Sequence, residues 1–515
     1  MKAIKGEKEM KHMKKLTGVL LALVMTLSLA TTAFADETTY SITINNSAEG
    51  HTYEAYQIFT GDLAEKDGKK VLSNIVWGRG ISEAGKTALG DAAAKAETLK
   101  TEADAKAFAK EVAPYLTTAA GSANTVTDGK YVISGLAAGY YLVKDKDDSL
   151  SGDADAYTEY IIRVVGDATA EPKSDVPEVE KKVKDINDST DDAMTDWQDS
   201  ADHDIGDSVP FQLKATLADN VSSYTTYKVV FHDTLSKGLT YNTDAKVYID
   251  GTETDGFTVT PTVNADGTTT LTISCDDVKV LGAGNSSVIT VEYTATLNSN
   301  AVLGSAGNPN DVYLTYSNNP NKSESGNNET GNTPKDTVIV FTYKTIINKV
   351  TKNPDYDPEV EGSEEYIPLT GAEFTLEKYN KETDKWEAIT VVKNDKGTTF
   401  TFSGLDDGDY RLTETKTPAG YNTIDPIEFT VTAKHDVRSD DPALTSLSGN
   451  VTTGELTFTS STTEGSLSAD VINNAGATLP ETGGIGTTIF YVLGTILVLG
   501  AGVLLVAKKR MNSEK

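Results

Sequence analysis

Cysteine is nearly absent from this sequence. Its 515 residues include a single cysteine, Cys275. One cysteine cannot form a disulfide within the chain, and there is no set of cysteines to hold a structural zinc ion. If the chain is exported, its domains must resist proteases and mechanical force without disulfide bonds.

Positive charge is also scarce. There are 46 lysine and arginine residues against 76 aspartate and glutamate residues, which gives a formal net charge of −30 at pH 7. Nucleic-acid binding needs a basic face, so this balance argues against nucleic acid as a partner. A self-repelling acidic surface is typical of a soluble extracellular protein.

Few residues are suited to catalysis. The chain has five histidines, and we find no phosphate-binding loop, zinc-ligand spacing or hydrolase triad in it. The aspartate-rich run KDINDSTDDAMTDWQDSADHD, at 184–204, lacks the turn glycine of an EF-hand calcium loop. We therefore expect a solvated acidic loop there, no metal, no cofactor and no enzymatic turnover.

The N-terminal end carries an export signal. A basic region ends at Lys15, an uncharged and largely apolar stretch follows at 16–30, and AFA at 33–35 forms an A-x-A cleavage site. This pattern predicts a secretory signal over residues 1–35.

The C-terminal end predicts a membrane helix. The 23 residues at 485–507 carry no charge, which is enough to cross a hydrocarbon core of about 30 Å. The tripeptide KKR follows at 508–510, and this positive charge favours a cytoplasmic tail with the bulk of the chain outside.

Between these ends the sequence reads as short β-strands. Segments such as YSITINN, YKVVFHD and SVITVEYTATLN are separated by Gly, Asn and Asp turns, a pattern typical of β-sandwich domains. One stretch, 82–120, is instead rich in Ala, Lys and Glu with apolar residues at helical spacing. We expect an all-β protein of three tandem Ig-like β-sandwich domains, the first with a helical insertion, followed by a C-terminal transmembrane helix.

An internal repeat and two polar linkers divide the chain. The segments YVISGLAAGYYLVKD (131–145) and FTFSGLDDGDYRLTE (400–414) align without a gap, so the first and last domains look like versions of one sandwich. The linker EPKSDVPE and the polar loop NNPNKSESGNNETGNTPKD mark the boundaries. After the signal at 1–35, the predicted segments are 36–170, 171–342, 343–478 and a C-terminal segment at 479–515.

The motif LPETGG, just before the apolar run, resembles the cell-wall sorting signal of Gram-positive surface proteins. In that family a membrane-bound sortase cysteine attacks the Thr–Gly bond, and an amine then resolves the acyl-enzyme. The resemblance implies cleavage within the recognition motif Leu479, Pro480, Glu481, Thr482 and Gly483, with Thr482 keeping the new bond.

The segment YRLTETKTPAGY, at 410–421, resembles the E-T-x-A-P-x-G-Y signature of Cna B-type domains, with a threonine in place of the usual alanine. Such domains form an intramolecular Lys–Asn isopeptide bond. The resemblance implies Lys349 as the nucleophile, Asn473 as its partner with Asn474 as the alternative, and Glu414 as the acid that polarises the carboxamide and moves protons. Burial in an apolar sandwich favours the neutral amine that this attack needs.

The middle domain shows a parallel pattern. PEVEKKVKD opens it, FHDTLSKGLTY lies within it and DVYLTYSNNP closes it, and these segments resemble the middle domain of shaft pilins. The resemblance implies a bond between a first-strand lysine and Asn318 of the Y-S-N segment, beside an acid. Period-two alternation favours Lys181 over Lys182, and we expect Asp233 as the acid, with Glu292 as the alternative.

The first domain is expected to lack such a bond. Asp145 aligns with Glu414 of the last domain, but the opening strand TTYSITINN has no lysine to match Lys349. The linker that follows this domain, AEPKS, resembles the Y-P-K segment of sortase-assembled pilins, with Glu171 in place of the tyrosine. The resemblance implies that Lys173 supplies the amine that joins subunits.

Over almost its full length the chain resembles the major, or shaft, pilin of a sortase-assembled Gram-positive pilus. The implied partners are identical subunits in a covalent homopolymer, a pilus-class sortase, a housekeeping sortase, peptidoglycan and ancillary pilins. The precursor would meet the membrane only through its C-terminal helix, and the mature protein would be anchored in the cell wall. The alternative is a wall-anchored adhesin or ancillary pilin that binds a host or matrix ligand, which would need the sorting signal but not Lys173.

Overall fold

The computed structural model describes most of the chain. The described residues are 39–66, 69–150, 154–158, 160–164, 166–172, 174–190, 194–388, 394–395, 397–476 and 485–511. The predicted signal at 1–35, Lys173 and the sorting motif at 479–483 lie outside them.

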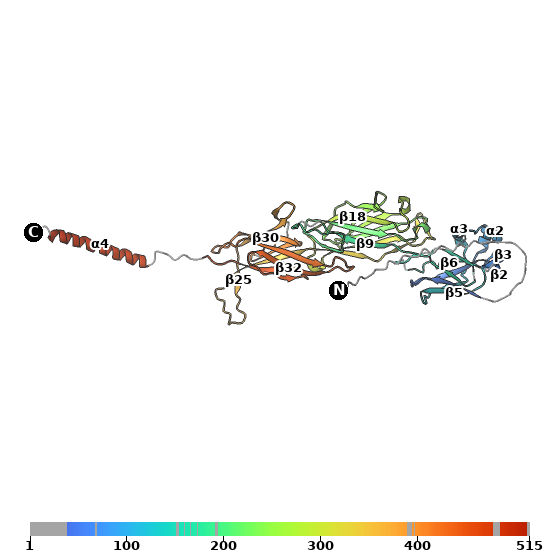
Figure 1. The fold of residues 1–515 in the computed structure, drawn as a ribbon, viewed down its shortest axis with the longest axis horizontal. Coiled ribbons are helices and arrows are strands. Elements are labelled where there is room, and N and C mark those ends of the chain that lie inside the picture. The colour runs from blue at the N-terminus through green and yellow to red at the C-terminus, as the bar shows by residue number, and fades with distance from the viewer. Residues whose placement is uncertain are drawn as a thin grey trace, which may run out of the picture.

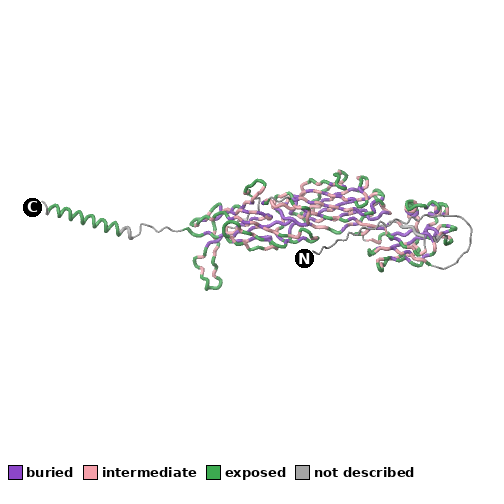
Figure 2. The backbone as a smooth tube through the Cα atoms, viewed as in Figure 1, coloured by how far each residue is buried: buried purple, intermediate pink, exposed green. Residues whose placement is uncertain are grey.

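Three β-sandwiches follow one another along the described chain, and a helix projects beyond the last one (Figure 1). Buried residues run through the interior of each sandwich, while the helix is exposed (Figure 2). The sandwiches form because successive strand side chains point to opposite faces, so an alternating sequence buries one face. The predicted all-β class with a C-terminal apolar helix is confirmed.

The first sandwich combines two sheets with a helical insertion. One sheet has the order β5-β1-β8, and the other has the order β3-β2-β6-β7 with β4 paired to β2. The predicted insertion is present as helices that pack on the second sheet. The bounds are β1 Tyr40–Asn45, β2 Tyr53–Lys66, β3 Lys69–Trp77, α1 Glu83–Leu89, α2 Ala92–Glu97, α3 Glu102–Val112, η1 Ala113–Tyr115, β4 Gly121–Ala123, β5 Lys130–Leu136, β6 Tyr140–Asp145, β7 Ile161–Val164 and β8 Ala168–Ala170.

The middle sandwich contains a large apolar core between its two sheets. One sheet has the order β10-β23-β19-β12-β17-β16 with β22 paired to β19, and the other β15-β14-β18-β11-β9 with β13 paired to β18. The bounds are β9 Glu178–Val183, β10 Ser200–Asp202, β11 Ser208–Thr216, η2 Val221–Ser223, β12 Val229–Leu235, β13 Leu239–Tyr241, β14 Lys246–Ile249, β15 Thr252–Thr254, β16 Thr258–Val263, β17 Thr269–Cys275, η3 Val278–Leu281, β18 Val288–Leu297, η4 Gly304–Ala306, β19 Asn308–Ser317, β20 Ser323–Glu324, β21 Asn327–Asn328, β22 Thr330–Asn332 and β23 Asp336–Phe341.

The last sandwich shares the central arrangement of the first. Its sheets have the orders β28-β29-β24-β34-β33, with β25 paired to β24, and β27-β26-β30-β31-β32. As β1 pairs antiparallel with β5 and parallel with β8, so β24 pairs antiparallel with β29 and parallel with β34. The bounds are β24 Tyr343–Lys352, β25 Tyr366–Pro368, β26 Glu373–Asn380, β27 Lys385–Ala388, β28 Asn394–Asp395, β29 Thr399–Leu405, β30 Gly408–Lys416, β31 Ile427–His435, β32 Leu444–Thr453, β33 Thr459–Ser461, β34 Ser466–Ile472 and α4 Ile485–Met511.

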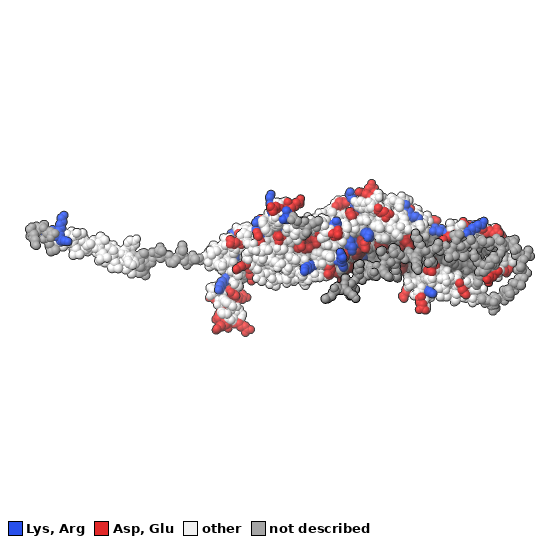
Figure 3. Space-filling view, in the orientation of Figure 1, with Lys and Arg blue, Asp and Glu red and all other residues white. Residues whose placement is uncertain are grey.

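The surface reflects the acidic composition. On the face that Figure 3 shows, acidic side chains are spread over all three sandwiches and gather at the tip of the arm that projects beside β25. Beyond the last sandwich, residues 489–510 of α4 are long and apolar enough to cross a membrane. Basic residues stand at the end of this helix.

Candidate crosslink sites and the domain junctions

The last domain brings a lysine, an acid and an asparagine together inside its sandwich. Lys349 lies on β24, Glu414 on β30, and Asn473 directly follows β34. Lys349 and Asn473 are fully buried and Glu414 is 6% exposed, whereas Asn474, the alternative partner, is exposed. The parallel pairing of β24 with β34 places Lys349 opposite Val471, so Asn473 follows two residues beyond that point.

The polar contacts of this cluster suit an attack on the asparagine side chain. Asn473 Nδ2 donates to both carboxylate oxygens of Glu414, at 3.0 and 3.2 Å. Lys349 Nζ donates to the Val471 carbonyl oxygen at 2.7 Å. Asn473 Oδ1 is buried and has no partner among the described residues. The acid therefore contacts the nitrogen that would leave, while the amine lies beside the adjoining backbone.

Burial makes the lysine a better nucleophile. Loss of solvation lowers the pKa of Lys349 to about 8, although the charge of Glu414 acts in the opposite direction. A lysine with that pKa is uncharged about 10% of the time at pH 7, compared with roughly 0.03% for an exposed lysine. The neutral amine is the form that can attack a carboxamide.

The middle domain contains a second buried cluster. Lys181 of β9, Asp233 of β12, Tyr293 of β18 and Asn310 of β19 are each at most 3% exposed. Lys181 Nζ donates to an oxygen of Asp233 and lies 3.2 Å from the Tyr293 hydroxyl. The same hydroxyl donates to the other Asp233 oxygen at 2.5 Å and accepts from Asn310 Nδ2 at 2.7 Å. Tyr293 thus connects the acid to the asparagine.

The electrostatics of this cluster favour a neutral amine beside a neutral acid. Burial lowers the pKa of Lys181, outweighing the attraction of Asp233, and burial raises the pKa of Asp233, outweighing the attraction of Lys181. A proton on Asp233 and a free pair on Lys181 are the states that an attack on a neighbouring carboxamide requires.

Asn318, the asparagine expected in this cluster, lies elsewhere. Strand β12 pairs with β19 so that Asp233 faces Val312, and Asn318 comes after the end of β19 at Ser317. Six residues of extended chain span roughly 20 Å. Asn318 instead accepts a hydrogen bond from the backbone N–H of Tyr157 in the first domain, at 2.7 Å. The buried cluster of Lys181, Asp233 and Tyr293 therefore includes Asn310, through its bond to the Tyr293 hydroxyl, and not Asn318.

Lys182 and Glu292, the second choices for the lysine and the acid of the middle domain, are engaged outside this cluster. Lys182 is half-buried and paired with Asp199, and Glu292 accepts from the Gln212 side chain at 2.8 Å.

A signal for Asn310 was available in the sequence. Asn310 is a polar residue on the face of β19 whose other members include the buried Val312, Leu314 and Tyr316. A polar side chain in such an apolar row needs a partner in the interior.

Residues 198–204, the last part of the aspartate-rich run, are not a solvated loop, contrary to expectation. They are wedged between the middle and last domains, and Asp199 and Asp202 are at most 7% exposed. Their backbone bonds to the last domain, for example from Asp199 N to the Val437 carbonyl oxygen at 3.1 Å. The sequence predicted a solvated loop because the run itself does not show which cations the neighbouring domain contributes.

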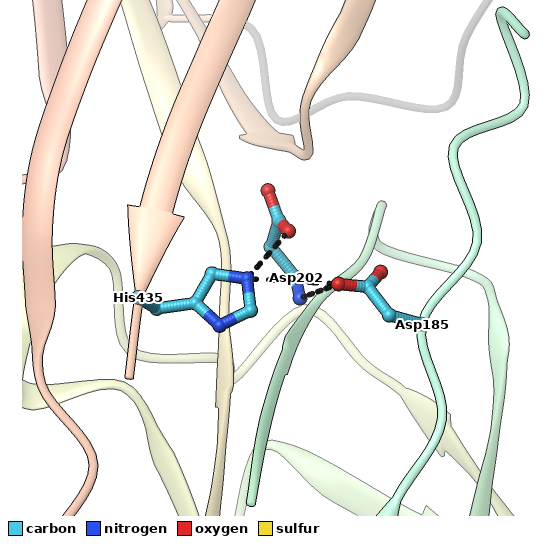
Figure 4. Close-up of side chains that lie close together, drawn as sticks. All are labelled: Asp185, Asp202 and His435. Atoms are coloured by element: carbon cyan, nitrogen blue, oxygen red, sulfur yellow. Dashed lines mark hydrogen bonds and ion pairs between the residues drawn. The ribbon is translucent and has the colours of Figure 1, made fainter. Parts of the chain in front are cut away.

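One of these cations is His435, at the end of β31 (Figure 4). Its Nε2 lies 3.2 Å from Asp202 Oδ1 and 3.6 Å from Asp185 Oδ2. Its Nδ1 lies 2.7 Å from the Ser200 hydroxyl. Burial opposes the positive charge, but the hydrogen bonds and charges of Asp185 and Asp202 outweigh it and raise the pKa of His435 to about 9. The imidazolium therefore acts as the cation, and the group is an ion-pair cluster.

The second cation is Lys378 of β26, which is 4% exposed. Its Nζ contacts Asp406 of its own domain and lies 2.7 Å from Asp204 Oδ2 of the middle domain. Burial opposes its charge, yet these two carboxylates raise the pKa of Lys378. A buried charge is tolerated here because it is paired across the junction.

Family models match three parts of the chain. Residues 205–320 match the model described as Gram-positive pilin backbone subunit 2, Cna-B-like domain. Residues 361–442 match the SpaA prealbumin-like fold domain, and residues 472–513 match the LPXTG cell wall anchor motif.

Known proteins resemble it over longer stretches. The trypsin-resistant surface T6 protein of Streptococcus pyogenes serotype M6 is 25% identical over 410 residues, which cover 66% of this chain and 70% of that protein. The solved structure of the T6 backbone pilin of serotype M6 Streptococcus pyogenes superposes with a TM-score of 0.55 at 18% identity, covering 87% of this chain and all of that one. That pilin is described as a modular three-domain structure. The chain therefore contains two segments that match pilin-type domain models and one that matches the LPXTG anchor motif, and its fold is similar to that of the T6 backbone pilin.

Proposed function

We propose that this protein is the structural shaft subunit of a covalently polymerised surface pilus. The observation that carries the proposal is the presence of a pilin backbone domain and an LPXTG anchor in one chain. Three sandwiches in a row make an elongated subunit, as a shaft needs (Figure 1).

The subunits are joined head to tail by sortase. The enzyme's thiolate attacks the carbonyl of Thr482 and releases the peptide that begins at Gly483. The Lys173 amine of another copy then attacks the thioester, which forms an amide and frees the thiol. α4 holds the precursor at the membrane beside the enzyme and so raises its effective concentration. A pilus-class sortase repeats this step, and a housekeeping sortase transfers the base of the polymer to peptidoglycan.

Two intramolecular crosslinks replace disulfides in the subunit. In the last domain the neutral Lys349 amine attacks the Asn473 side-chain carbon, an amide bond forms, and the former Nδ2 leaves as ammonia. Glu414 carries the proton from the amine to the leaving nitrogen, a role supported by its contacts of 3.0 and 3.2 Å to that atom.

In the middle domain the corresponding bond joins Lys181 to Asn310. Asp233 acts as the acid, supported by its contact with Lys181, and Tyr293 positions the carboxamide through its 2.7 Å bond to Asn310 Nδ2. The chemistry is the same: one amide forms and one ammonia leaves. Each reaction occurs once in each molecule, so the protein modifies itself without being an enzyme.

Denaturing electrophoresis of cell-wall extracts tests the shaft role. Wild-type cells should give a high-mass ladder that reacts with antibodies to the protein, and Lys173→Ala cells should give only the monomer. Lys335→Ala removes an exposed lysine whose side chain is 64% accessible, and this control should keep the ladder. Identical patterns for wild type and Lys173→Ala would refute polymerisation through this residue.

A further inference from the structure

The first domain shares the central strand pairings of the last domain but has a different residue at the position of the lysine. Ile44 of β1 faces Tyr131, as Ile347 of β24 faces Phe400, and Tyr131 and Phe400 are equivalent positions of the internal repeat. Two residues further along the chain from Ile44 and from Ile347, Asn46, just after the end of β1, therefore corresponds to Lys349.

A second pairing supports the same equivalence. Asn45 Nδ2 donates to Glu171 Oε1 at 2.6 Å, and Asn348 Nδ2 donates to Asp470 Oδ1 at 3.0 Å. In both domains an asparagine of the central strand, β1 or β24, thus donates a hydrogen bond to a carboxylate of the chain segment that runs parallel to it. By the repeat alignment, Asp145 stands where the last domain has the acid Glu414.

Asp145 has different partners from those of Glu414. Its Oδ1 lies 2.8 Å from His51 Nδ1, and its Oδ2 accepts from the backbone N–H of Thr158 at 2.7 Å. The His51 ring stacks on Tyr53, whose hydroxyl lies 3.2 Å from the Thr158 hydroxyl. His51 and Asp145 are 3% exposed and Thr158 is fully buried, so these contacts form in the interior.

Thr158 belongs to the segment 154–158, which we call the strap, and the strap also contacts the middle domain. Asn321 Nδ2 donates to the Thr158 carbonyl oxygen at 3.0 Å. The backbone N–H of Tyr157 donates to the Asn318 carbonyl oxygen at 2.7 Å, and the Tyr316 hydroxyl donates to the carbonyl oxygen of strap residue 155 at 3.1 Å. The N–H of Thr158 is thus bound by the first domain and its C=O by the middle domain.

We propose that the His51–Asp145 pair is an interdomain clamp. The acid that would serve a crosslink in the last domain here binds the strap, and the strap fixes the first domain on the middle domain. A buried carboxylate is unfavourable unless it is hydrogen-bonded, so releasing the strap would leave Asp145 without one of its two partners. The position of the strap is therefore coupled to the buried His51–Asp145 pair of the first domain. This inference does not depend on polymerisation by sortase.

Pulsed electron spin resonance on the mature, unpolymerised protein tests the clamp. Nitroxides attached at Lys130→Cys on β5 and Thr252→Cys on β15, both exposed sites, in a Cys275→Ala background report the distance between the two domains. The parent protein should give one narrow distance distribution. Asp145→Ala and Asn321→Ala should each widen it at least twofold.

The control is Asn264→Ala, which removes two side-chain hydrogen bonds within the β16–β17 turn and should leave the distribution narrow. If Asp145→Ala unfolds the first domain, Thr158→Pro, which removes the N–H bound by Asp145 together with the hydroxyl beside Tyr53, takes its place and should also widen the distribution. A broad distribution in the parent, a narrow one in Asn321→Ala or in the folded Asp145 or Thr158 variant, or equal widening in Asn264→Ala would overturn the proposal.

Discussion

Three buried lysines in this protein behave differently because their partners differ. Lys349 has one nearby acid and its pKa falls to about 8. Burial also lowers the pKa of Lys181, which has one directly bonded acid, whereas two carboxylates raise the pKa of Lys378. At Lys378 the two carboxylates outweigh the loss of solvation, whereas at Lys181 and Lys349 the loss of solvation is the larger effect. Burial alone therefore does not identify a nucleophile, because the raised pKa of Lys378 disfavours its neutral form.

The proposed bonds predict a mass deficit. Recombinant mature protein should weigh about 34 Da less than its sequence mass, because each crosslink releases one ammonia of about 17 Da. Asn310→Ala should halve the deficit, whereas Asn318→Ala should leave it unchanged, as measured by intact-mass spectrometry. The reverse result for these two variants would contradict the geometry of the middle-domain site, and a full sequence mass for the wild type would refute both bonds.

At the residue scale, alternation along strands and family resemblance predicted most of the proposed site residues. Lys181, Asp233, Lys349, Glu414 and Asn473 all lie in buried clusters. Asn318 lies outside the cluster in which it was expected, because the register between β12 and β19 decides which asparagine lies near the acid. Register depends on pairing between distant strands, and a motif that spans one strand does not contain it.

At the element scale, a crosslink between β24 and β34 would strengthen the strand pairing that bears the pulling force. β34 is the last strand before the anchor, and it is held to β24 by a parallel ladder from Ser466 to Ile472. A bond from Lys349 to Asn473 would close a loop of 124 residues. It would also hold the strand that receives the pull of the attached subunit.

Loss of this bond should reduce the stability of the last domain. Glu414→Ala keeps both bonding residues but removes the proton carrier, so the domain should stay uncrosslinked. By analogy with a disulfide that closes a loop of this size, unfolding should become easier by about 4–5 kcal/mol. Differential scanning calorimetry should show a lower melting temperature, and the mass deficit should shrink by about 17 Da relative to the wild type.

Glu373→Ala is a suitable control, because Glu373 forms an exposed pair with Lys416 and such surface pairs contribute little. A Glu414→Ala protein that retains both the mass deficit and the melting temperature would exclude Glu414 from the reaction.

The strands and helices themselves could be predicted from the sequence. Period-two alternation predicted the sandwiches, and helical spacing predicted the insertion that became α1 to α3. The aspartate-rich run was misjudged because its solvation depends on a partner domain. Its polar sequence suggested that its side chains contact water, whereas some of them contact Lys378 and His435 of the last domain.

At the scale of the whole molecule, the two junctions are built differently. The strap joins the first and middle domains through hydrogen bonds in which its own backbone groups meet backbone and side-chain groups of the middle domain. The middle and last domains meet over ion pairs that are largely shielded from solvent. The second junction should therefore respond to pH.

The pH response of this junction has a definite sign. The pKa of His435 is raised from 6.5 to about 9. The raised pKa of His435 adds to the free energy of unfolding. This contribution is fully present below about pH 6.5 and is lost as the pH rises through 9, and it is at most on the order of 3 kcal/mol. Denaturant unfolding at pH 6.5 and pH 9.5 should show lower stability at the higher pH. In His435→Asn the loss of stability between the two pH values should be smaller by the His435 contribution. An equal loss in both proteins would contradict the ion-pair account.

Head-to-tail assembly requires that Thr482 of one subunit is joined to Lys173 of the next. Mass spectrometry of tryptic peptides from polymer that a peptidoglycan hydrolase releases from cell walls detects this bond itself. We expect a branched peptide in which the Thr482 carbonyl is bonded to the Lys173 side-chain nitrogen. If the Lys173 peptide is recovered only with a free amine, and Thr482 is found only on peptidoglycan fragments, the protein is a singly anchored surface protein and not a shaft subunit.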